Sequence, residues 1–210
     1  MKKMTRALIL APHPDDGEFS TGGTICKMSR EGTEFWYAAF SPCAKSIPEG
    51  FSKDVLFQEL ENAVSHLGIP AERIKTYQFS VRDFPEHRQP ILEEMIKLRD
   101  EIDPDTVFMP NSNDVHQDHQ VIHNEGVRAF KNCNMLGYEV PWNSFKFSND
   151  YFVKLNADHL DAKWKAIQEY KSQEFRKYSD RALFDGLARV RGCQVNTEFA
   201  EAFELIRWIA

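Results

Sequence analysis

A short, wholly apolar segment near the N-terminus limits the folds that this chain can adopt. Residues 7–11 are all alanine, leucine or isoleucine, as expected for a strand that is covered on both faces. Pro12 and Pro14 then prevent further strand pairing, and the pattern becomes helical over residues 19–30. A buried strand that leads directly into a helix favours an α/β fold built on a parallel sheet.

Strand-like and helical segments alternate along the rest of the chain. Strands are expected at residues 7–11, 34–40, 74–79, 106–109 and 151–155. Helices are expected at residues 19–30, 52–67, 89–102, 119–130 and 157–170. Residues 199–209 fit either a strand or a short helix, and long loops are expected at 40–50, 79–88 and 132–149. This alternation predicts a mostly parallel sheet with helices on both faces, formed by residues 1–210 as a single domain.

The composition fits one globular domain. A chain of 210 residues, 42% of them hydrophobic, can bury one core, and no linker divides it. The net charge of −6 provides no basic surface for nucleic acid or for an anionic membrane. No apolar stretch approaches the roughly 18 residues of a membrane-spanning helix, and residues 7–11 are too short for a signal-peptide core. Four well-separated cysteines are expected to be free thiols in a reducing cytoplasm.

A cluster of ionisable residues follows the first predicted strand, in the sequence HPDDGE at residues 13–18. His13 and Asp16 are three residues apart, and an imidazole with a carboxylate suits a divalent metal. Asp15 would then be free to take a proton from water. The alternative is that Asp15, Asp16 and Glu18 only cap the helix, and for Glu18 both interpretations remain open. Capping gives no reason for a histidine between two prolines.

A second cluster, HQDH at residues 116–119, follows the strand expected at 106–109. Ligands of an α/β sheet collect beyond the carboxyl ends of its strands, so the two clusters should lie at one edge. Either His116 or His119 could supply a third metal ligand, and the other could polarise a carbonyl or protonate a leaving amine. Asp118 could orient one of them. His123, one helical turn further, is expected to be structural. Together the clusters predict a metal-dependent hydrolase.

At these two motifs the sequence resembles the PIG-L (LmbE-like) family of zinc-dependent N-acetylglucosamine deacetylases. The first motif, PHPDDGE at residues 12–18 followed by GGT at 22–24, is highly specific in this context. The second, HQDH at 116–119, is moderately specific. Weaker similarities, such as Arg82, the YKSQ segment at 170–173 and the RG pair at 191–192, extend over most of the chain. Pro12 stands where the family often has alanine.

The resemblance implies a Rossmann-like α/β fold and a role for each motif residue. It implies zinc, or another divalent metal such as Fe²⁺, held by three side chains: His13, Asp16 and His119. It implies that Asp15 is the general base and that His116 stabilises the oxyanion or assists the leaving amine. It also implies that Asp118 tunes His116. The substrate would be a small N-acetylated amino sugar, carried on a glycoconjugate or a sugar nucleotide.

Substrate contacts are expected in two loops. Arg82 is expected to bind a hydroxyl or phosphate and Asp83 a sugar hydroxyl, the alternative being a surface ion pair. Trp142, Phe145 and Phe147 could line a sugar face or simply anchor their loop. Two other functions remain open: a metal-dependent amidase acting on a thiol conjugate or another non-sugar N-acyl substrate, and a metal- or nucleotide-binding module without catalysis. A homo-oligomer also remains open.

Overall fold

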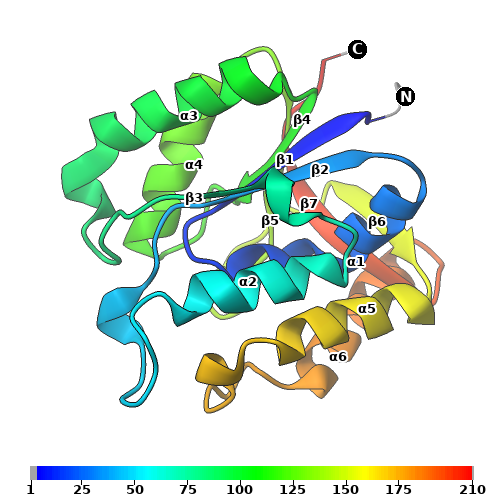
Figure 1. The fold of residues 1–210 in the computed structure, drawn as a ribbon. Coiled ribbons are helices and arrows are strands. Elements are labelled where there is room, and N and C mark those ends of the chain that lie inside the picture. The colour runs from blue at the N-terminus through cyan, green and yellow to red at the C-terminus, as the bar shows by residue number, and fades with distance from the viewer. Residues whose placement is uncertain (1–3, 210) are drawn as a thin grey trace.

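The computed structural model describes residues 4–209, and in this part of the chain a seven-stranded sheet forms the centre of the molecule (Figure 1). Its strands are Arg6–Ala11 (β1), Glu34–Ala39 (β2), Ile74–Thr76 (β3), Thr106–Pro110 (β4), Asn134–Tyr138 (β5), Tyr151–Leu155 (β6) and Phe199–Arg207 (β7). The order across the sheet is β3-β2-β1-β4-β5-β7-β6. All neighbours pair in parallel except β7, which is antiparallel to both β5 and β6.

Helices cover both faces of the sheet. They are Asp16–Arg30 (α1), Val55–Ser65 (α2), Arg88–Ile102 (α3), Gln117–Ala129 (α4), Ala157–Gln168 (α5) and Arg181–Gln194 (α6). In Figure 1, α3 and α4 lie on one face, and α1, α2, α5 and α6 lie on the other. The side chains of β1 alternate between the two layers: Leu8 and Leu10 belong to the core beneath α3 and α4, whereas Ile9 belongs to the opposite core. This two-sided burial explains why residues 7–11 carry no polar side chain.

The observed elements confirm the expected fold class, with two differences. Residues 134–138, expected to lie in a loop, form the interior strand β5, and residues 181–194, for which no element was predicted, form α6. Asn134 and Gly137 obscure the strand pattern of β5, because both residue types are uncommon within strands. Gly137 is needed because a Cβ atom there would lie 3.0 Å from the Cα of Asn111. The C-terminal segment is a strand, β7. Within residues 4–209 no helix is long and apolar enough to cross a membrane.

The sheet order places the two sequence motifs next to each other. β1 and β4 are neighbouring parallel strands, so their carboxyl ends lie at the same edge of the sheet. The chain leaves β1 through α1 on one face, and it leaves β4 through α4 on the other face. The crevice between these two exits is the position where open α/β sheets bind ligands.

Candidate active site

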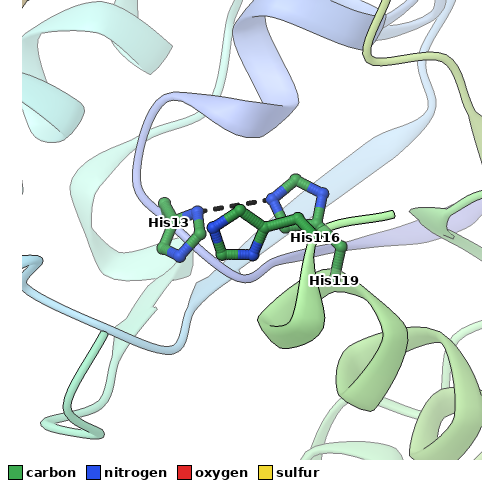
Figure 2. A group of neighbouring side chains, drawn as sticks. All are labelled: His13, His116 and His119. Carbon is green, nitrogen blue, oxygen red and sulfur yellow. Dashed lines mark hydrogen bonds between the residues drawn. The ribbon is translucent and has the colours of Figure 1, made fainter. Parts of the chain in front are cut away.

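Three atoms from the two motifs form a small triangle at this edge of the sheet. Nδ1 of His13 lies 3.2 Å from Oδ2 of Asp16, and Nε2 of His119 lies 3.3 Å from the same oxygen. The two histidine nitrogens are 3.3 Å apart, as the dashed line in Figure 2 marks. Zinc bound tetrahedrally at its usual 2.0–2.1 Å places its N and O ligands about 3.3 Å from one another. The three side chains therefore fit a single divalent ion.

Hydrogen bonds fix which nitrogen of each ring is available to a metal. Nε2 of His13 lies 3.1 Å from the Asp118 carboxylate, and Nδ1 of His119 lies 2.7 Å from the Asp114 carboxylate. In the neutral form of each ring, the nitrogen beside the carboxylate carries the hydrogen, because a carboxylate only accepts, and the lone pair of the opposite nitrogen faces the triangle. Burial lowers the pKa of both histidines, but the charge of Asp16 and the carboxylate hydrogen bonds outweigh it. Their pKa values rise to about 9 for His13 and about 10 for His119.

His116 stands beside the triangle with a different tautomer. Its ring centroid is 5.0 Å from that of His13 and 4.8 Å from that of His119, and the ligand atoms of all three lie within 4.8 Å of one another (Figure 2). His116 caps α4, because its Nδ1 accepts the backbone N–H of Asp118 at 3.1 Å. Its Nε2 therefore carries the hydrogen of the neutral ring. Burial, and then the positive charges of His119 and His13, lower the pKa of His116 to about 4, so the ring is neutral at pH 7.

The Asp118 carboxylate does not contact the residue that the sequence analysis assigned to it. We expected it to tune His116, but its Oδ2 contacts His13 Nε2 and accepts the backbone N–H of Arg82 at 2.7 Å. The reason is the helix start, where His116 accepts the Asp118 backbone N–H and the carboxylate is left facing the neighbouring loops. The partner of His119, Asp114, was missed, because a carboxylate five residues before a histidine forms no recognisable spacing.

Asp15 occupies the N-cap position directly before α1, yet its side chain makes no capping hydrogen bond. It is half-buried and lines a cavity of about 290 Å³ that also exposes His13, Asp16, His116 and His119. Burial and the charge of Asp16 raise the pKa of Asp15 to about 6. A carboxyl group that neither caps the helix nor completes the ligand triangle is available for proton transfer inside this cavity.

Glu18 is fully buried and does not serve as a cap. Its two carboxyl oxygens lie 2.7 Å from the hydroxyl of Tyr37 and 2.8 Å from that of Tyr170. Both hydroxyls also lie within hydrogen-bond distance of the Pro14 carbonyl, at 2.5 and 2.9 Å. Burial raises the pKa of Glu18 to about 8. This cluster therefore anchors the loop that presents His13, and neither tyrosine was singled out as an anchor from the sequence.

The cavity wall includes some of the predicted substrate residues and not others. Arg82 and Trp142 line the cavity, whereas Phe145 is largely exposed and is not part of the wall. Asp83 also lies outside the wall and forms an ion pair with Lys45, the surface alternative considered for it. The wall also contains polar residues that the sequence analysis did not select as substrate contacts, among them Asn143, Gln173 and Arg176.

A comparison with known protein families shows which family has this arrangement of residues. The PIG-L family, described as GlcNAc-PI de-N-acetylase, matches residues 8–130, more than half of the chain. The chain belongs to the PIG-L family. Membership confirms the resemblance in the two motifs and places the protein among enzymes that hydrolyse amide bonds. The matched region contains both motifs and Arg82, but it ends before the part of the cavity wall formed by residues 142–178.

One curated relative and two solved structures are 17–24% identical to this PIG-L protein. It is 24% identical over 173 residues to the uncharacterized deacetylase YaiS of Escherichia coli K12, covering 79% of this chain and 90% of that protein. The structure of N,N'-diacetylchitobiose deacetylase from Pyrococcus horikoshii superposes with a TM-score of 0.79 at 21% identity, covering 96% and 83% of the two chains. The structure of GalB of Pseudomonas putida, a 4-carboxy-2-hydroxymuconate hydratase, superposes with a TM-score of 0.77 at 17% identity. The match covers 99% of this chain and 98% of GalB. One fold therefore carries more than one reaction.

Proposed function

We propose that this protein is a zinc-dependent deacetylase that removes the acetyl group of an N-acetylated amino sugar. The observation that carries the proposal is the triangle of His13, Asp16 and His119 with the uncapped carboxyl of Asp15 beside it in the cavity. Deacetylation is the activity named for the PIG-L family and for YaiS, and the Pyrococcus enzyme named above acts on an N-acetylated sugar. Two nitrogens and one oxygen suit zinc, with Fe²⁺ as the alternative metal.

Zinc held by His13, Asp16 and His119 would act as a Lewis acid that activates water and polarises the acetamide carbonyl. The carboxylate of Asp15 takes the proton from the attacking water as its oxygen bonds to the acetamide carbon. The same carboxyl then delivers this proton to the nitrogen as the C–N bond breaks. The products are acetate and a free amine, so one residue serves first as base and then as acid.

His116 serves as a hydrogen-bond donor in this scheme. Because its Nδ1 accepts the Asp118 backbone N–H, its Nε2–H points away from the helix start and is free to donate. The oxygen of the acetamide gains negative charge in the transition state, and a donor in place stabilises that charge. The neutral form of His116 can perform this role, because a neutral ring still carries one hydrogen to donate.

A panel of N-acetyl substrates tests the reaction directly. We expect zinc-loaded protein to release free amine from N-acetylglucosamine or one of its derivatives, such as the disaccharide N,N'-diacetylchitobiose or a sugar nucleotide. A chelator should abolish release, and added zinc should restore it, because the ligand triangle is empty without metal. Amine is quantified with a fluorogenic reagent and acetate with a coupled enzyme assay. Release only from N-acyl amino acids or thiol conjugates would support the non-sugar amidase instead.

His116→Ala is expected to lower kcat by about 10²–10³-fold, the usual effect of removing one oxyanion donor. Zinc content should remain one per chain, because the tautomer of His116 directs a hydrogen toward the cavity and leaves no lone pair there. Steady-state kinetics and elemental analysis of the same preparation measure both quantities. His66→Ala is the matched control, because His66 pairs with Glu169 at the surface and does not line the cavity, and its kcat should not change. A normal kcat for His116→Ala would exclude the donor role.

A further inference from the structure

Asp118 joins the proposed metal ligand His13 to a turn in the cavity wall. Its carboxyl group is fully buried, and a single oxygen makes both contacts. Oδ2 lies 3.1 Å from Nε2 of His13, and it accepts the backbone N–H of Arg82 at 2.7 Å. The other oxygen, Oδ1, has no hydrogen-bond partner among the described residues. The position of this carboxylate is therefore set by two donors, one on the metal side and one on the turn.

The turn that Asp118 contacts has a backbone conformation that depends on its neighbours. The N–H of Asp83 donates to the carbonyl oxygen of Ser80 at 3.1 Å, so Arg82 is the second central residue of a four-residue turn. Its φ angle is 73°, in the left-handed region that a residue with a Cβ atom rarely adopts. Asp118 accepts its N–H, and the Gln117 side chain donates to its carbonyl oxygen. The start of α4 therefore holds both polar groups of the Arg82 backbone.

The same turn forms part of the wall of the proposed active site. Val81 and Arg82 line the cavity together with His13. Phe84, which follows the turn, is fully buried, and its ring centroid lies 6.3 Å from that of His13. This ring contact does not involve Asp118, so the turn and the His13 loop should stay adjacent when Asp118 is changed. What Asp118 adds is the acceptor that orients the Arg82 backbone.

We propose that Asp118 is a positioning residue that couples metal binding at His13 to the conformation of the turn at residues 80–83. The inference rests on the metal site of the proposed function and adds that this part of the wall is ordered by the metal. A divalent cation at Nδ1 of His13 makes the Nε2–H a stronger donor, which fixes the Asp118 carboxylate. The oxygen fixed in this way is the acceptor of the Arg82 N–H. Coupling is reciprocal, so a well-formed turn also raises the metal affinity.

Amide hydrogen exchange of Arg82, resolved by ¹⁵N NMR, measures the coupling without any substrate. In the unmodified protein, zinc should slow the exchange of this N–H by about fivefold or more, the lower end of typical coupling between two sites. Asp118→Asn removes the charge that responds to the metal, so zinc should no longer slow the exchange. Asp114→Ala is the matched control, because it removes the carboxylate partner of the other histidine, His119. The hydrogen bonds of Asp114 to described residues stay within 111–120, so at saturating zinc this variant should keep the slowing.

Two variants of Arg82 test the coupling in the reverse direction. Arg82→Pro removes the donated N–H and cannot adopt a φ of 73°, so zinc affinity should fall by about fivefold or more although no ligand is changed. Arg82→Gly removes the whole side chain but keeps the N–H and suits the left-handed backbone, so zinc affinity should not fall. Competition with a fluorescent chelator measures the affinity, and circular dichroism verifies that each variant is folded.

Three results would overturn the coupling: Arg82 exchange that does not respond to zinc in the unmodified protein, equal slowing in Asp118→Asn, or equal losses of zinc affinity in Arg82→Gly and Arg82→Pro. The last result would assign the effect to the side chain. None of these measurements requires turnover, so they separate this inference from the proposed function. A protein that couples zinc to the turn but releases no amine keeps the inference and contradicts the deacetylase. A protein that releases amine without the coupling does the reverse.

Discussion

Asp15→Asn is expected to keep its zinc and to lose about 10²–10⁴-fold in kcat, the contribution of a positioned general base. The amide has the shape of the carboxyl group but cannot accept the proton of the attacking water. The side chain of Asp15 is not one of the three corners of the ligand triangle and makes no capping hydrogen bond, so the fold and the metal site should persist. Initial rates of amine release give kcat, and elemental analysis gives the zinc content.

The pH dependence adds a second readout for the same residue. A base acts in its deprotonated form, so kcat/KM should rise with pH through the pKa of Asp15 and then become level. Burial and the Asp16 charge raise that pKa to about 6, and a bound cation lowers it, so the acidic limb should fall at or below pH 6. Asp100→Asn, a change at an exposed surface ion pair, serves as the control. Asp15→Asn protein with the parent rate would exclude the base assignment.

The second large effect is expected for Asp16→Ala, which should lose both its zinc and its activity. Oδ2 of Asp16 is the corner of the triangle that contacts both histidine nitrogens. It also accepts the backbone N–H of His13 at 2.9 Å. Its removal therefore deletes a ligand and releases the loop that carries another. Zinc should fall well below one per chain after dialysis, and His119→Ala should behave in the same way.

A graded series tests the ligand assignment. Asp114→Ala removes the partner of His119 Nδ1 but no ligand, so zinc affinity should fall by about 10- to 100-fold, as is usual for outer partners of metal-bound histidines. His116→Ala should retain zinc fully. If His116→Ala loses zinc while Asp16→Ala keeps it, the ligands are His13, His116 and His119, a set that the clustering of the three rings also allows.

Segments with strong local patterns could be predicted from the sequence. The strands β1 and β4 and the helices α1 to α5 follow runs or periodicities that their own burial imposes. β5 could not be found in this way, since Gly137 is required by a neighbour from a distant segment, the backbone of Asn111. The helix α1 also begins at Asp16, earlier than its apolar pattern, because acidic residues and a glycine occupy its first turn.

In the candidate site too, local spacing could be predicted from the sequence, whereas contacts between distant segments could not. Residues three apart on a helix start lie on one side, so the two motifs indicated the triangle. Tyr37, Tyr170 and Arg176 reach the site only through the register of β2 and the short turn at 171–173, which no local spacing encodes. The contact of Asp118 with His13 was missed for that reason, since it joins segments 105 residues apart.

The contacts around the Pro14 carbonyl have a consequence for the charge of the first motif. Four short contacts join Glu18 and this carbonyl to the hydroxyls of Tyr37 and Tyr170, yet the two hydroxyls bring only two hydrogens. A protonated Glu18 supplies a third, in agreement with its raised pKa of about 8. One of the three acidic residues in the motif, Glu18, is therefore uncharged at neutral pH. The buried Glu18 thus holds the loop of His13 without adding a negative charge next to the proposed metal site at neutral pH.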